Sequence, residues 1–160
     1  MEKKNNKKNV EIANSILLPE IVKFMNEGHT VTLLLKGYSM RPFLEHGRDE
    51  GLLKKADSPK IGTPVLAEIA PGKYVLHRLI AVNGEKVTLL GDGNITPEYC
   101  RYSDVKGEAI GFYRKGRKQL DPIDGWKWKV YSKLWMSLRP IRRWLLAFYR
   151  RIWIPIFGTI

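Results

Sequence analysis

Ser39 stands where the chain could present a nucleophile. The β-branched and leucine-rich run 29–36 leads into residues 37–42, GYSMRP, so Ser39 follows a predicted strand in a turn flanked by glycine. A serine at the end of a strand can hold its hydroxyl beside backbone N–H groups, which suits attack on a carbonyl carbon. The alternative is a serine that only caps or turns the chain. Ser39 is therefore a candidate nucleophile.

His77 and Asp92 could supply the proton transfer that a nucleophilic serine needs. His77 lies in the apolar run 74–82, and an ordinary pKa of about 6.5 suits a general base at neutral pH. Asp92 lies in the turn 91–94, GDGN, and could orient the imidazole. The competing interpretations are a histidine satisfied within the core and an aspartate chosen only for its turn geometry.

These three segments, in this order, resemble the signal peptidase superfamily, which includes the LexA-type self-cleaving repressors. The GYSMRP segment is similar to the G-x-S-M-x-P element that carries the nucleophilic serine there. The His77-Arg78 pair and the following G-D-x-N resemble the branch of endoplasmic-reticulum and archaeal signal peptidases, which uses histidine in place of lysine. The resemblance covers about residues 31–114, with 105–111 as the closing strand, and implies a mainly β fold.

The resemblance implies a role for each candidate residue. Ser39 would be the nucleophile and His77 the general base. Asp92 would be the acid that orients His77, with Glu98 as the second candidate and Asp104 a distant third. No cofactor and no metal ion are implied.

The resemblance also implies how the oxyanion would be held. Backbone N–H groups of Ser39 and Met40 would stabilise it, because Gly37 offers no hydroxyl where some relatives have a serine. Arg78 is expected to brace the sheet or bind a carboxylate rather than transfer protons.

A helical entry and a β body are expected to position these residues. Apolar positions recur at helical spacing over 10–27, where Pro19 should divide the segment into two helices or start the second. The strand candidates are 29–36, 64–69, 74–82, 86–90 and 109–114. Asn83-Gly84 between two of them predicts a hairpin. The fold class is therefore mainly β (α+β), with a short N-terminal helical segment and a C-terminal amphipathic helical pair.

Charge and composition divide the chain further. The net charge is +12, and it is concentrated at the two ends. We predict a disordered basic lead over 1–9, a peptidase-like β domain over 10–120, a linker over 121–125 and a basic aromatic tail over 126–160. The single cysteine excludes an intramolecular disulfide framework. The three histidines lack H-x-x-x-H spacing, so a zinc enzyme is not expected.

The tail has a composition typical of an interfacial helix. Residues 126–160 contain all five tryptophans and eight basic residues but no acidic one, and Pro140 separates two amphipathic stretches. Such a tail could contact an anionic membrane peripherally, or could pack as a helical hairpin on the β body. Nucleic acid is a weaker candidate partner, because no recognisable nucleic-acid-binding module accompanies the tail.

The sequence as a whole predicts a serine endopeptidase that cleaves a leader or signal-like peptide through an acyl-enzyme. No N-terminal signal peptide or spanning segment is evident, which predicts a cytoplasmic location, free or peripheral at the inner face of the membrane. One alternative is a catalytically silent peptide-binding or membrane-docking module with the same fold. Another is a self-cleaving LexA-like regulator, which is disfavoured because residues 1–28 are too short for a helix-turn-helix domain and His77 replaces the lysine.

Overall fold

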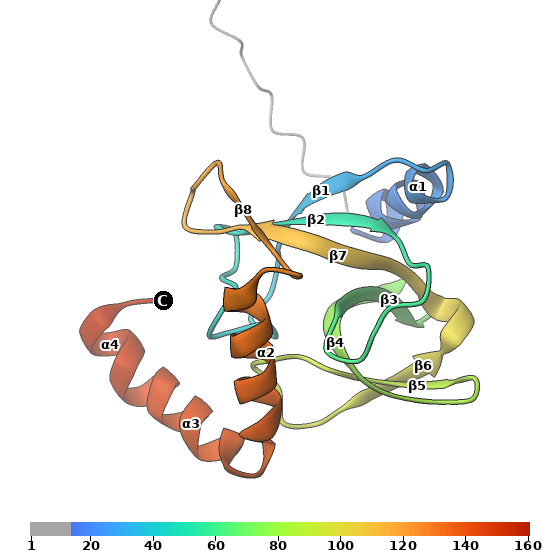
Figure 1. The fold of residues 1–160 in the computed structure, drawn as a ribbon. Coiled ribbons are helices and arrows are strands. Elements are labelled where there is room, and N and C mark those ends of the chain that lie inside the picture. Colours follow the sequence, from blue (N-terminus) through green and yellow to red (C-terminus); the bar gives the residue numbers. More distant parts are fainter. Residues whose placement is uncertain (1–13) are drawn as a thin grey trace, which may run out of the picture.

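The computed structural model describes residues 14–160, so the predicted basic lead lies outside the described residues. One antiparallel sheet of eight strands forms the body, with a helix along its upper edge and a helical C-terminal arm below and beside it (Figure 1). The fold is thus α+β with a dominant sheet, as the sequence predicts.

The sheet follows the order β1-β2-β7-β3-β4-β5-β6, and β8 pairs separately with β7. All five predicted strands are present, and β7 covers both the apolar run 109–114 up to Tyr113 and the residues 105–111 that the resemblance gives as the closing strand. Three further strands, β2, β6 and β8, were not predicted. The bounds are β1 (Val31–Leu34), β2 (Glu50–Lys55), β3 (Pro64–Ala70), β4 (Lys73–Asn83), β5 (Lys86–Leu90), β6 (Glu98–Arg101), β7 (Val105–Tyr113) and β8 (Leu120–Pro122).

The long strand β4 changes neighbours halfway along its length. Its first half pairs with β3, from Lys73 opposite Ala70 to Arg78 opposite Pro64. Its second half pairs with β5 from Arg78 onward, through the predicted hairpin at Asn83. Within the described part of the chain, the other edge of β4 before Arg78 therefore has no strand beside it.

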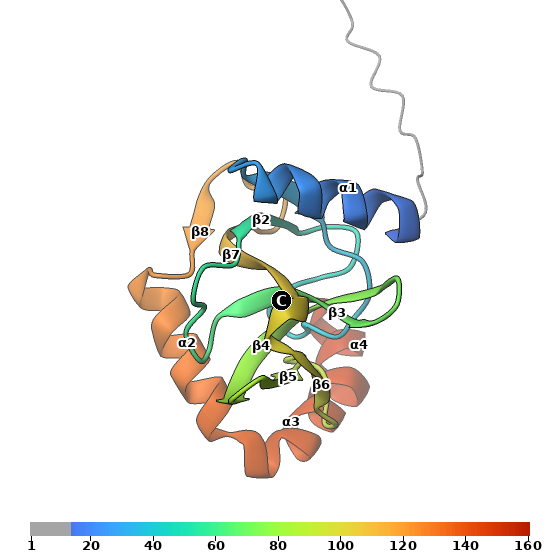
Figure 2. The same ribbon diagram turned by 90° about the vertical axis from the view of Figure 1, so that its right-hand side faces the viewer.

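The N-terminal helix α1 (Asn14–Asn26) packs across β1, β2 and β7 (Figure 2). Leu18, Ile21 and Met25 are buried on its inner face. A Cβ on Gly107 would come within 2.9 Å of Met25 Cε, so a glycine lets α1 approach β7 closely. The expectation that Pro19 would divide this segment is wrong. Pro19 lies inside one helix that is continuous over Asn14–Asn26.

The C-terminal arm consists of two helical stretches that meet near Pro140, as predicted. They are α2 (Trp126–Ser137), the 3₁₀ turn η2 (Arg139–Ile141), α3 (Arg142–Phe148), the π-helical turn η3 (Tyr149–Trp153) and α4 (Ile154–Phe157). The segment predicted as a linker, 121–125, begins with the last two residues of β8. The arm therefore leaves directly from the sheet.

The first helix of the arm packs on the body. Trp128 is 4% exposed and belongs to the main hydrophobic core. Its ring lies 5.0 Å from those of Phe43 and Phe112, centroid to centroid. This core joins α1, the sheet and α2 into one packed unit.

Candidate active site

Ser39 lies in the loop between β1 and β2, half-buried. Gly37 turns the chain ahead of it with φ of 93°, and the Gly37 N–H donates a 2.8 Å hydrogen bond to His46 Nδ1. In the described part of the chain, the Ser39 hydroxyl makes no hydrogen bond. Its oxygen is therefore not engaged in capping or turning the loop.

The turn 91–94 packs directly on the Ser39 loop. The Gly93 N–H donates a 2.7 Å hydrogen bond to the Ser39 carbonyl oxygen. A Cβ on Gly91 would collide with that same carbonyl, and a Cβ on Gly93 would come within 2.7 Å of the Tyr38 carbonyl oxygen. The two glycines of this motif therefore allow the close approach of two backbones. The structure thus brings two of the predicted segments together.

His77 is buried, with 3% of its side chain exposed, and its Nδ1 lies 2.6 Å from Glu98 Oε2. Both atoms are shielded from solvent, and although they lie this close, neither has hydrogen-bond geometry toward any group among residues 14–160, so they form a close contact of a base and an acid. Burial lowers the pKa of His77 below its ordinary value of 6.5, and the opposing effects of Glu98 and Asp92 do not reverse this shift. The imidazole is therefore neutral at neutral pH, as a general base must be.

Asp92 does not face His77 but Arg78, and this corrects the expected choice of acid. Arg78 donates from Nε to Asp92 Oδ1 at 2.9 Å and from Nη2 to Oδ2 at 2.6 Å. Successive residues of a strand point to opposite faces, so the acid that pairs with Arg78 lies across the sheet from His77. Glu98, the second candidate, occupies the place beside His77. Asp104 accepts a bond from the Arg101 N–H instead.

The prediction that Arg78 binds a carboxylate is confirmed by these two bonds. Arg78 and Asp92 are at most 1% exposed, and burial of a charge is tolerable only with such a partner. The pair holds the turn that packs on Ser39. Arg78 therefore belongs to the framework of the site.

Ser39 and His77 line the same cleft, which has a volume of about 150 Å³. One wall comes from the loop after β1 and the other from the free-edged first half of β4. Besides these two residues, the lining comprises Leu35, Lys36, Gly37, Met40, Leu44, Glu45, Tyr74, Val75 and Leu76. The candidate nucleophile and the candidate base thus open onto one small space.

The backbone N–H groups of Ser39 and Met40 are available in the described structure. Neither finds a hydrogen-bond acceptor among residues 14–160, whereas the next amide, of Arg41, donates to the Tyr38 carbonyl at 3.2 Å. Two unpaired donors beside a hydroxyl could stabilise a developing oxyanion.

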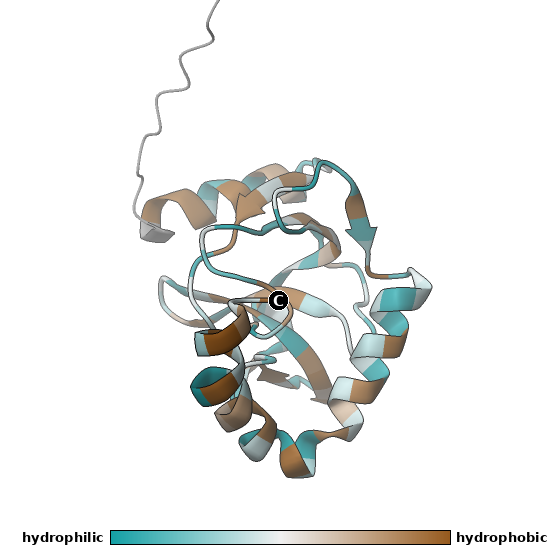
Figure 3. Cartoon of the chain, turned by 90° about the vertical axis from the view of Figure 1, so that its left-hand side faces the viewer, coloured by the Kyte–Doolittle hydropathy of each residue, from teal (hydrophilic) through white to brown (hydrophobic). Residues whose placement is uncertain are grey.

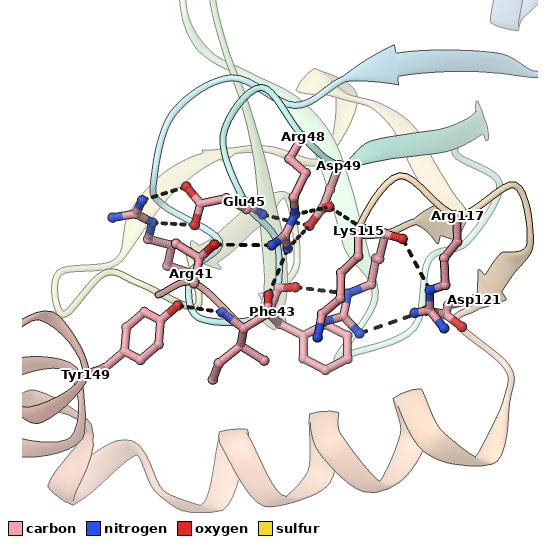
Figure 4. Close-up of polar contacts among 12 residues, drawn as sticks. Arg41, Phe43, Glu45, Arg48, Asp49, Lys115, Arg117, Asp121 and Tyr149 are labelled. Carbon is pink, nitrogen blue, oxygen red and sulfur yellow. Dashed lines mark hydrogen bonds and ion pairs between the residues drawn. The ribbon is translucent and has the colours of Figure 1, made fainter. Parts of the chain in front are cut away.

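The loop after Ser39 is anchored by a network of charged groups around Asp49 (Figure 4). Asp49 is fully buried and accepts 2.9 Å bonds from the backbone N–H groups of Glu45 and Lys115. Burial acts to raise the pKa of Asp49, but Arg48 and these N–H groups lower it below its ordinary value. Arg41 closes the network on Glu45. The ionised Asp49 thus ties the loop to the end of β7.

Three residues of α2 form hydrogen bonds to Arg78 and Asp92, and they were not identified from the sequence. The Tyr131 hydroxyl donates to Asp92 Oδ2 at 2.9 Å, and Trp135 Nε1 donates to the Asp92 carbonyl at 3.1 Å. Ser132 Oγ accepts from Arg78 Nη1 at 2.6 Å. Burial raises the pKa of Tyr131 well above its usual value and keeps its proton available. The only signal was the apolar face expected of this helix, which does not specify hydrogen bonds.

No protein-family model matches this chain, and no curated protein matches it either. Among residues 14–160, no three histidine, cysteine, aspartate or glutamate side chains gather where they could hold a metal ion. No helix in the described part of the chain is sufficiently long and apolar to cross a membrane.

Proposed function

We propose that this chain is a serine endopeptidase of the signal peptidase type, with Ser39 as the nucleophile and His77 as the general base. The observation that carries the proposal is the cleft that these two residues share, together with Glu98 at 2.6 Å from His77 Nδ1. Because Nδ1 faces Glu98, Nε2 is the ring nitrogen left to exchange a proton with Ser39. Nucleophile, base and orienting acid are the parts that acyl transfer requires.

Each step of the proposed reaction uses a group described above. Ser39 Oγ attacks the substrate carbonyl carbon while its proton passes to His77 Nε2. Backbone N–H groups of Ser39 and Met40 stabilise the oxyanion of the tetrahedral intermediate. The peptide C–N bond then breaks, and the leaving amine takes the proton from His77. A water molecule attacks the acyl-enzyme in the same way and releases the acid product and Ser39.

The free edge of β4 supports an extended peptide as the substrate. Residues 73–77 offer backbone groups that no strand among the described residues uses, and they border the cleft. A peptide added there as a strand would be held in register for attack by Ser39. A cleft of about 150 Å³ favours small side chains next to the scissile bond. A leader or signal-like peptide has this character.

A serine-directed acylating probe tests the proposal without knowledge of the substrate. The full chain is incubated with a fluorophosphonate, and the adduct is measured by intact mass. We expect one adduct on the wild type and none on Ser39→Ala. His77→Ala should form it at least about 100-fold more slowly, since the loss of a general base costs about 10²–10⁴ in rate.

Two results would contradict the proposal. An adduct that persists on Ser39→Ala would place the reactive group elsewhere. Failure of the folded wild type to react from pH 5 to 9, with or without lipid vesicles, would instead favour a silent peptide-binding module. Thermal unfolding of each variant serves as the control for intact structure.

A further inference from the structure

The outer face of the C-terminal arm carries an apolar stripe that the proposed peptidase chemistry does not use. Helices α3, η3 and α4 follow one another without a break in helical backbone angles, from Arg142 to Phe157. Arg142, Leu146 and Tyr149 form the buried side of this helical run. The exposed apolar residues recur three or four positions apart and comprise Ile141, Trp144, Phe148, Ile152 and Ile156.

The exposure of this stripe is large for residues of this type. Trp144 is 71% exposed and Ile156 is 65% exposed. Trp153 and Phe157 lie beside the stripe and are also exposed. Along these helices, apolar turns alternate with strongly polar turns, shown as brown and teal in Figure 3. Exposed apolar side chains that recur along one side of a helix mark a place where a partner binds.

The charges around the stripe identify the partner. Arg143 is exposed and lies 5.8 Å over the ring of Trp144, Arg151 is exposed next to Ile152, and residues 126–160 contain no acidic residue at all. We infer that this stripe docks the protein on an anionic lipid bilayer, with the arm lying in the plane of the interface. Apolar side chains would enter the headgroup boundary while the arginines meet lipid phosphates.

The same charges argue against other occupants. A second copy of the chain would bring two sets of arginines together with no acidic side chain from either arm to neutralise them. Single-stranded nucleic acid would need a row of stacking aromatic rings. Three of the five stripe residues, Ile141, Ile152 and Ile156, are aliphatic and cannot stack on bases. A lipid bilayer accepts both the isoleucines and the aromatic rings.

The docked arm would lie close to the candidate active site. Arg150 Nη2 donates a 2.7 Å hydrogen bond to the carbonyl oxygen of Gly93, in the turn that packs on Ser39. The docking itself does not depend on peptidase activity. A binding measurement therefore tests it independently of the proposed function.

Cosedimentation of the full chain with lipid vesicles provides the test. Vesicles of phosphatidylcholine alone are compared with vesicles that also contain phosphatidylglycerol. We expect binding to the anionic vesicles only, and weaker binding when sodium chloride rises from about 0.1 M to about 0.5 M, because salt shortens the reach of the charges.

A matched pair of variants locates the binding surface. Ile156→Ser in α4 should weaken vesicle binding about tenfold, which is the size expected for one buried isoleucine side chain. Ile16→Ser in α1 removes an isoleucine of equal exposure, 66%, from a helix elsewhere on the body and should leave binding unchanged. Far-UV circular dichroism verifies that both variants are folded.

Several outcomes would overturn the inference. One is the absence of binding to anionic vesicles, and another is equal binding to phosphatidylcholine alone. Equal losses in the two isoleucine variants would indicate unspecific adhesion. A dimer in sedimentation velocity that Ile156→Ser abolishes would assign the stripe to a second copy. Tight binding of a single-stranded oligonucleotide that requires Ile156 would assign it to nucleic acid.

Discussion

Two neighbouring residues of β4 serve opposite faces of the sheet. His77 points to the side where Glu98 begins β6, while Arg78 points to the side where α2 packs. Each is buried and faces its own carboxylate, and because the two side chains point to opposite faces, the two acids cannot exchange places. Glu98 therefore lies beside the proposed base, whereas Asp92 neutralises a buried guanidinium.

Glu98→Gln and Asp92→Asn should consequently fail in different ways. Glu98→Gln should slow acylation of Ser39 by about 10²–10⁴-fold, because the imidazolium formed during attack loses its counter-ion. The free energy of unfolding should change by less than about 1 kcal/mol. Asp92→Asn leaves Arg78 charged and buried, which should cost about 3–5 kcal/mol of stability. Fluorophosphonate labelling rates and denaturant unfolding measure the two effects.

The pH dependence separates the two acids further. Acylation requires neutral His77, so its rate should rise with pH through the pKa of His77, which burial places below 6.5. Glu98 acts to raise that pKa, so Glu98→Gln should move the rise to lower pH. Below pH 6.5 the unfolded chain binds a proton that folded His77 resists, so stability should decrease as the pH falls. If Asp92→Asn shifted the rise of the acylation rate with pH and Glu98→Gln did not, Asp92 rather than Glu98 would be the acid that acts on His77.

At the scale of elements, the backbones of two loops pack directly against each other. The turn between β5 and β6 meets the Ser39 loop through the Gly93 N–H and the Ser39 carbonyl oxygen. Neither loop has regular structure of its own, so each fixes the other. The position of Ser39 therefore depends on glycines in a different part of the chain.

Gly93→Ala tests this dependence. Its Cβ would lie 2.7 Å from the Tyr38 carbonyl oxygen, so the Ser39 loop must shift. Displacement of a nucleophile by about 1 Å can cost about 10²-fold in rate, and we expect at least a tenfold loss of labelling. Gly84→Ala is the control. Gly84 has φ of 58° with open space around it, so alanine there should cost about 1 kcal/mol of stability and little rate. Equal rates for the two variants would show that the contact does not position Ser39.

The elements that sequence patterns identify well are those with strong local signals. The Asn83-Gly84 turn and the apolar runs of β3, β4 and β5 predicted the central hairpins. β2 escaped notice because its sequence, EGLLKK, is half charged, and β6 because it has only four residues. Missing β6 also meant that Glu98 could not be placed beside His77, since that contact depends on the pairing of Leu89 with Glu98. Non-local pairing, rather than residue type, decided which acid meets the base.

At the scale of the whole molecule, one side of the arm packs on the body and its other side is exposed. Trp128 enters the core shared with α1 and the sheet, and Tyr131 closes the Arg78–Asp92 pair. Sequence periodicity gave the two helices of the arm but not which apolar residues would be buried. Leu134 and Trp128 belong to the same amphipathic stretch, yet Leu134 is 57% exposed whereas Trp128 is 4% exposed.

This packing predicts that the arm and the sheet unfold together. All five tryptophans lie in residues 126–160, so tryptophan fluorescence follows the arm, while far-UV circular dichroism also follows the sheet. Their unfolding midpoints in guanidinium chloride should coincide, as two-state behaviour requires. Trp128→Ala should lower both midpoints, with a loss of about 3–5 kcal/mol. Trp126→Ala, at a residue that is 73% exposed, should move neither. A fluorescence transition at a lower guanidinium chloride concentration than the circular dichroism transition would mean that the arm unfolds separately. The hydrogen bonds from Tyr131 and Ser132 would then contribute little to the stability of the Arg78–Asp92 pair.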